Sequence, residues 1–189
     1  MLTKIITNTP SNIWYTQLGV PQSYRNQLIK ETYRLKNRKN RDNELLFKQI
    51  FNETNSKVIG SSHRIWEESK VYNLLLKNIL KFIYSTSPSW EEGYKINNAW
   101  AGVYSQNQIA VSHHHEPAYK SFCYYIKAEE PYTPMVFKNE NIEIDAITDR
   151  LIVFYSTLSH EVPPCISDER IMIAGNIVSG YEKIGSFEI

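Results

Sequence analysis

The sequence predicts an α+β fold, a two-sheet jelly roll with helices buttressing one outer face. Helical periodicity is confined to the first half of the chain. The second half consists of short segments rich in β-branched and aromatic residues, separated by turn-forming residues. Thirteen tyrosines and four tryptophans also suit pleated, half-buried surfaces. Helices first and many strands afterwards are typical of this class.

Three stretches of the first half are predicted to be helical. Residues Pro21 to Arg34 carry a weak apolar face, and proline is tolerated in a first turn. Residues Asn43 to Phe51 suggest a short helix. The clearest helix spans Ile65 to Tyr84, with an apolar stripe of Val71, Leu75, Ile79 and Phe82 at helical spacing. This stripe is expected to pack into the core.

Six strands are predicted in the second half. They span Tyr94 to Tyr104, Ser121 to Lys127, Pro134 to Lys138, Asn141 to Ala146, Leu151 to Tyr155 and Arg170 to Ser179. In two of them, alternating residues separate an apolar face from a face that also carries isolated polar groups. The mixed faces carry Ser121, Cys123 and Tyr125 on one strand, and Arg170, Met172, Ala174 and Asn176 on the other. A cavity that holds a polar ligand would be lined in this way.

The bulk properties indicate one domain over residues 1–189, helical over about 20–85 and a jelly roll over about 94–189. A net charge of +1 argues against a nucleic-acid partner. The basic run Lys30 to Arg41 is expected to be a solvated helix end and loop, with a docking patch for a polyanion as the alternative.

Nothing in the sequence points to a membrane or to export. No apolar run approaches the roughly 18 residues that a membrane span needs. The polar N-terminus is too short for a signal peptide. Cys123 and Cys165 lie far apart without a second cysteine nearby, which favours reduced thiols and a cytoplasmic location.

Four of the five histidines fall in two places, a triplet and His160, while His63 stands apart and is expected on the surface. Residues i and i+2 at a strand end point the same way. Either His113 with His115 or His114 with Glu116 could therefore form a ligand pair, and His160 would be the third ligand. A site of two histidines and one carboxylate is usual for non-haem iron, so chemistry alone favours the second pair.

Arg170 is a fixed cation on the strand face that carries Met172 and Ala174. An unpaired arginine on such a face would be costly, so it needs an anion. Its planar fork matches a carboxylate. The partner is expected to be a ligand in the cavity, or else Glu161 or Asp168.

The C-terminal half, residues 98–176, resembles the iron(II)- and 2-oxoglutarate-dependent oxygenases. It is most similar to a small branch common in phages and marine bacteria and related to the prolyl hydroxylases. The stretches that carry the resemblance are Trp100, His113–His115, Ser121–Ile126, Leu151–Ser156, Leu158–Pro164 and Glu169–Ile177. The resemblance implies a double-stranded β-helix, another description of the jelly roll. The helical half is similar only in layout.

The resemblance implies a role for each matched residue. The iron ligands and catalytic centre fall on His113, His115 and His160. The far carboxylate of 2-oxoglutarate would meet Arg170, and tyrosines equivalent to Tyr125 and Tyr104 would help to hold this cosubstrate. Histidine replaces the common aspartate at the second ligand position. Met172 stands where a serine often follows the arginine by two residues.

The implied activity is that of a dioxygenase. It would consume 2-oxoglutarate and O2, release succinate and hydroxylate a substrate that the sequence does not identify; the resemblance points to a peptide or protein residue. One alternative is a cupin-like jelly roll whose histidines hold zinc, nickel or manganese without oxygenase activity. Another is an interaction protein with a vestigial pocket. A cupin-like site has no need of Arg170.

Overall fold

The computed structural model describes residues 7–9, 13–37, 57–59, 64–86 and 93–178. The helices are α1 (Gln22–Lys36), α3 (Ile65–Glu68) and α4 (Val71–Ser85). The larger sheet contains β1 (Thr7–Asn8), β2 (Trp14–Gln17), β3 (Lys57–Ile59), β4 (Lys95–Ser105), β6 (Lys120–Ala128), β9 (Arg150–Tyr155) and β11 (Glu169–Val178). The smaller sheet contains β5 (Ala110–His113), β7 (Met135–Phe137), β8 (Ile142–Ile144) and β10 (His160–Val162). A 3₁₀ turn, Lys138–Glu140, joins β7 to β8.

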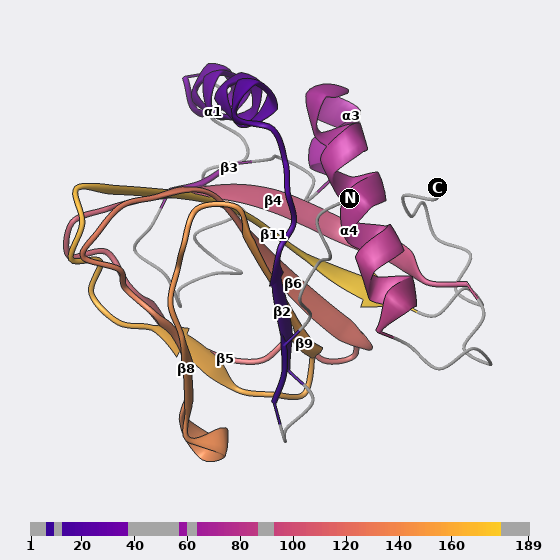
Figure 1. Ribbon diagram of the computed structural model, residues 1–189, viewed down its shortest axis with the longest axis vertical. Coiled ribbons are helices and arrows are strands. Elements are labelled where there is room, and N and C mark those ends of the chain that lie inside the picture. The colour runs from indigo at the N-terminus through magenta and orange to yellow at the C-terminus, as the bar shows by residue number, and fades with distance from the viewer. Residues whose placement is uncertain (1–6, 10–12, 38–56, 60–63, 87–92, 179–189) are drawn as a thin grey trace.

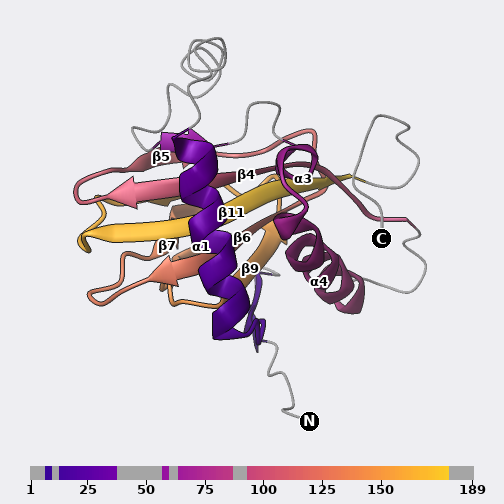
Figure 2. The same cartoon turned by 90° about the horizontal axis from the view of Figure 1, so that it is seen from above.

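The two sheets and the helices form layers (Figure 1). The seven strands of the larger sheet run in the order β1-β2-β9-β6-β11-β4-β3, and the four of the smaller sheet in the order β5-β10-β7-β8. Paired strands are antiparallel. Figure 2 shows α1 crossing over the strands of the larger sheet, with α4 beside it. The predicted jelly roll with buttressing helices is confirmed.

The helix predictions hold for α1 and need one correction. The continuous helix expected from Ile65 to Tyr84 is wrong, because Ser69 adopts extended angles, φ −157° and ψ 125°, between α3 and α4. The Ser69 hydroxyl accepts a hydrogen bond from the Val71 N–H at 3.3 Å. Serine competes for backbone groups in this way and starts a new helix. The helix expected over 43–51 and the position of His63 lie outside the described residues.

All six predicted strands are present, with ends shifted by at most two residues. Sequence patterns missed β1, β2 and β3 of the larger sheet and gave no bounds for β5 and β10 of the smaller one. These five strands have two to four residues each, too few for alternation to stand out. No helix in the described ranges is long and apolar enough to cross a membrane.

The larger sheet separates two apolar clusters, as the alternation predicts. Its outer face packs on the helices, and its residues Tyr124 and Ile173 belong to the same apolar cluster as Leu75 and Ile79. Its inner face packs on the smaller sheet and carries Cys123, Tyr125, Met172 and Phe154. Strand β6 therefore sends alternate side chains into different clusters. The inner cluster contains Cys123, Tyr125 and Met172, which the sequence placed on the mixed apolar and polar faces of two strands.

Lys120, at the start of β6, is fully buried. Its ammonium nitrogen lies 4.8–5.5 Å from the ring centroids of Trp14, Tyr94, Tyr119 and Tyr155. Each such contact attracts a cation through the ring quadrupole. The cluster therefore links the start of β6 to Trp14 of β2 and Tyr155 of β9.

Asp149 fastens the N-terminal segment to the sheet, so Asp149→Ala should lower stability markedly. Its carboxylate accepts hydrogen bonds from the N–H groups of Gly19 (2.7 Å) and Val20 (3.0 Å) and from the Tyr124 hydroxyl (2.8 Å). Orphaned buried donors cost about 1–3 kcal/mol each, so we expect a loss of about 3 kcal/mol or more in urea denaturation.

Asp149→Asn is the matched control. The amide side chain of this variant would keep one acceptor oxygen, and asparagine tolerates the positive φ of 71° at this position. The variant should therefore retain a substantial part of the stability. Equal losses in the two variants would contradict an origin in the accepted hydrogen bonds.

Candidate metal centre

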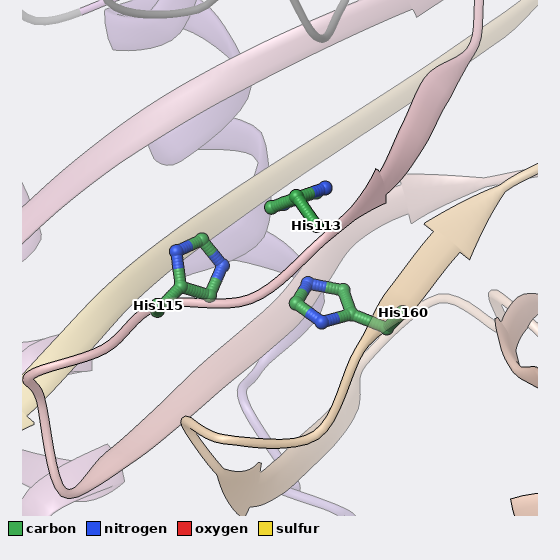
Figure 3. Close-up of side chains that lie close together, drawn as sticks. All are labelled: His113, His115 and His160. Atoms are coloured by element: carbon green, nitrogen blue, oxygen red, sulfur yellow. The ribbon is translucent and has the colours of Figure 1, made fainter. Parts of the chain in front are cut away.

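Three imidazoles converge between the two sheets. His113 ends β5 and His160 begins β10, and these residues are direct partners in the antiparallel register. His115 follows two residues after β5, in the connection to β6. One ring nitrogen of each histidine lies within 4.8 Å of the corresponding nitrogens of the others. Figure 3 shows the three side chains clustered at this point.

Two of the rings are oriented by backbone carbonyls. The Nδ1 atom of His113 lies 2.7 Å from the Val111 oxygen, and that of His160 lies 3.1 Å from the Leu158 oxygen. A carbonyl only accepts, so in each neutral ring Nδ1 carries the proton and Nε2 keeps a free lone pair. Metal-binding histidines are typically oriented in this way. This arrangement makes Nε2 the available ligand atom in both rings.

Burial keeps two of the three rings, His115 and His160, uncharged. His160 is 4% exposed. Desolvation, followed by the neighbouring imidazoles, lowers the pKa of His115 and that of His160 to about 3. Both rings are therefore neutral near pH 7, the state in which imidazole binds metal.

Acid should destabilise the metal-free protein through these two rings. Histidines in the unfolded chain bind protons near their ordinary pKa of about 6.5, whereas the folded protein resists protonation of His115 and His160 until about pH 3. Stability should fall as the pH drops below about 6.5 and level off, for these groups, near pH 3. At about pH 5 the loss is at most about 2 kcal/mol for each ring.

Urea denaturation with a chelator present, near neutral pH and at about pH 5, measures this loss. His160→Phe should shrink the pH effect by about half, because one of the two depressed groups is gone. His114→Ala should change it only slightly, since that side chain is exposed and is the smallest named cause of the two lowered pKa values. A pH effect of the same size in all three proteins would contradict the assignment.

The other pair suggested by the sequence lies outside the cluster. His114 Nε2 and Glu116 Oε2 are 3.2 Å apart, with 51% and 58% of their side chains exposed. The pairing of His113 with His160 decides this arrangement. It turns His113 inward, and His115 joins it, while His114 and Glu116 face solvent.

A pocket extends from the histidines into the space between the sheets. Its volume is about 60 Å³, enough for several water molecules, since one water needs roughly 10–15 Å³. All six residues singled out from the sequence line it: Tyr104, His113, His115, Tyr125, His160 and Arg170. The remaining walls are Trp100, Ala110, Phe122, Cys123, Met135, Phe154, Val162, Met172 and Ala174. The pocket is therefore mainly apolar, with a few polar groups.

Arg170 is the cation of this pocket and is 2% exposed. Its guanidinium carbon lies 4.3 Å from the Tyr104 ring centroid and 6.0 Å from that of Tyr125. Nη1 donates to the Thr133 carbonyl oxygen at 3.3 Å. Within the described part of the chain, Nε of Arg170 and the hydroxyl of Tyr125 are buried without a hydrogen-bond partner.

Neither carboxylate considered from the sequence pairs with Arg170. Glu161 bonds Lys138 at 2.8 Å, and Asp168 is exposed. Among the described residues, no ion pair involves Arg170. A buried, partly unsatisfied guanidinium in a pocket is suited to bind an anionic ligand.

Sequence patterns assigned no role to Thr133 and Ser156. Thr133 offers its carbonyl to Arg170, and the Ser156 carbonyl accepts the His115 N–H at 2.8 Å. Both contacts use backbone atoms, which any residue type supplies. Side-chain patterns therefore carry no signal for them.

No protein-family model matches the sequence, and neither does any curated protein with which it was compared. The solved structures give a different result. A viral collagen prolyl hydroxylase from Paramecium bursaria Chlorella virus 1, in complex with 2-oxoglutarate, superposes with a TM-score of 0.62 at 16% identity, covering 87% of this chain and 94% of the viral one. The fold is that of the prolyl hydroxylases.

Two further prolyl hydroxylases have the same fold. The prolyl 4-hydroxylase of Pseudomonas putida gives a TM-score of 0.57 at 16% identity, covering 88% of this chain and 92% of its own. The Trichoplax adhaerens enzyme, in complex with a peptide fragment of the hypoxia-inducible factor oxygen degradation domain, gives 0.59 at 14% identity, covering 88% and 84%. In this chain the imidazole cluster and Arg170 lie in one pocket of that fold.

Proposed function

We propose that this protein is an iron(II)- and 2-oxoglutarate-dependent dioxygenase that hydroxylates a peptide or protein residue. The observation that carries the proposal is the pocket itself. Three imidazoles gather within 4.8 Å at one place in it, and a buried guanidinium without a carboxylate partner lines the same space. The shared fold with prolyl hydroxylases supports the same reading.

The donor set fits the metal. Imidazole nitrogen binds divalent iron well, and three ligands leave positions open for other molecules. His113, His115 and His160 would hold the ion, the first two from one segment and the third from β10. When bound, iron would supply the activation of dioxygen for hydroxylation. The protein contributes the orientation of the ligands and an apolar enclosure.

Arg170 would bind the far carboxylate of 2-oxoglutarate. Its Nη1 already bonds Thr133, whereas Nε lacks a partner. The edge that contains Nε is therefore available for a carboxylate, and Tyr104 keeps the guanidinium plane in place by stacking on it. Burial raises the pKa of Tyr125 well above its usual value. Tyr125 therefore stays protonated and can donate its hydroxyl to the same carboxylate.

The substrate class rests on the structural neighbours. One is a collagen prolyl hydroxylase, and another was solved with a peptide fragment. A peptide or protein residue is therefore the proposed substrate class for this chain. We place the reaction in the cytoplasm, in keeping with two cysteines that form no disulfide.

The test is to add iron(II) and then 2-oxoglutarate to the protein without oxygen. A new visible absorption band is expected only when both are present, and admission of oxygen should then yield succinate. His114→Ala is the matched control, because it removes an exposed imidazole next to the centre and should change neither result. Metal binding without any effect of 2-oxoglutarate would overturn the proposal and favour the cupin-like alternative.

A further inference from the structure

His115 is held differently from the other two histidines of the centre. The rings of His113 and His160 are each fixed by a carbonyl two residues earlier in the chain. No described residue hydrogen-bonds the ring of His115, which also lies outside the regular strands. Its hydrogen bonds run through the backbone, where the N–H donates to the Ser156 oxygen at 2.8 Å and the carbonyl accepts the Ala118 N–H at 3.0 Å. The Ser156 carbonyl therefore ties the backbone of His115 to the residue that follows β9.

Ser156 belongs to a buried chain of polar side chains. Its hydroxyl lies 2.7 Å from that of Ser121, which donates to Asn176 Oδ1 at 2.8 Å. Each hydroxyl has one proton, so Ser156 must donate to Ser121. Ser156 is fully buried, and Ser121 and Asn176 are 1% and 9% exposed.

The far end of this chain is anchored in the larger sheet. The Asn176 N–H donates to Asn98 Oδ1 at 3.1 Å, where β11 and β4 change register after Asn176. Ser121 lies in β6, next to Asn176 in β11. Two central strands thus fix the Ser156 side chain at the end of β9.

We propose that Ser121, Ser156 and Asn176 are positioning residues that hold His115 in place in the metal centre. This inference rests on the proposed function of that centre. Strands β6 and β11 form a rigid frame. Hydrogen bonds from Asn176 and Ser121 fix the Ser156 side chain, and the Ser156 carbonyl fixes the backbone of His115. Removal of the Ser121 hydroxyl would leave two buried polar groups unsatisfied. The end of β9 would then shift, and the third imidazole would move with it.

The probe is Zn²⁺, titrated against a chelating dye. Ser121→Ala should weaken Zn²⁺ binding about tenfold or more, the usual effect of losing an outer hydrogen bond at a metal site. Ser156→Ala, which removes the first donor of the chain, should act in the same direction. Ser121→Thr keeps the hydroxyl and should restore most of the affinity.

The decisive measurement repeats Ser121→Ala in a His115→Ala background. With the third imidazole absent, Zn²⁺ affinity should be lower by more than about 100-fold. The serine change should not lower this residual affinity further, because the two changes act through one group. An additive loss in the double variant would overturn the proposal.

Thr32→Val is the matched control for general destabilisation. Thr32 forms a hydroxyl pair of similar length with Tyr72, 2.8 Å, buried between α1 and α4 on the far side of the larger sheet. This change should lower stability and leave Zn²⁺ affinity intact. If Ser121→Ala has no greater effect on affinity than Thr32→Val, the positioning role is wrong. If the unaltered protein itself binds no Zn²⁺, the metal centre fails first, and the two failures are distinguishable.

Discussion

His160→Ala should weaken metal binding by more than about 100-fold, while His114→Ala leaves it unchanged. Of the three proposed ligands, His160 alone comes from a separate strand, and it directly faces His113 in the register. Its removal leaves two imidazoles from one segment. Loss of an outer hydrogen bond already weakens metal affinity by about 10–100-fold. Removal of a ligand should therefore exceed about 100-fold.

Metal content after dialysis against iron(II) or zinc measures the outcome for each histidine variant. His113→Ala and His115→Ala should behave like His160→Ala, and Glu116→Ala should behave like His114→Ala. The exposed His114–Glu116 pair serves as an internal control because it offers metal-binding donor types at the same spacing. Retention of metal by His115→Ala together with loss in Glu116→Ala would reverse the assignment.

The choice between these pairs shows what local sequence cannot decide. Both have i, i+2 spacing, and both would present two donors on one side of an extended strand. The phase is set by the partner strand, since a shift of one residue turns every side chain to the opposite face. Here the partner is β10, about 45 residues later in the chain, a separation at which local pattern carries no information on pairing. Resemblance to a family identified the pair that the structure brings together, although ligand chemistry favoured the other.

The side chains of β6 and β11 that face the pocket were easier to predict. Alternation on β6 and β11 placed Tyr125 and Arg170 on one inner surface, and both lie there. Arg170 shares a strand face with Met172 and Ala174, and burial of an unpaired charge there would be costly. The sequence alone therefore marks it as a residue that needs an anionic partner. The break at Ser69, by contrast, involves a side chain that accepts a hydrogen bond from the backbone N–H of Val71, two residues later. The apolar stripe gave no sign of this contact, so the periodicity alone predicted one continuous helix.

Arg170→Met should weaken 2-oxoglutarate binding at least about 30-fold without unfolding the protein. Loss of one partner from a buried charge pair costs about 2–5 kcal/mol, so the dissociation constant should rise by roughly 30-fold to several thousandfold. Titration of 2-oxoglutarate into the iron(II)-loaded protein without oxygen measures this change through the absorption band. Arg150→Met is the matched control, because Arg150 also stacks on a tyrosine, 5.4 Å from the Tyr15 ring centroid, yet does not line the pocket.

The effect of Arg170→Met on stability should have the opposite sign from that on binding. The guanidinium is buried with Nε unsatisfied, so it has lost hydration without gaining a full set of partners. Replacement of a buried charge by an apolar side chain of similar length is often neutral or stabilising by about 1–4 kcal/mol. Unfolding of the cosubstrate-free protein should therefore require at least as much urea as before. A large loss of stability would show that Arg170 serves the fold, and the lost affinity could then not be assigned to a missing carboxylate contact.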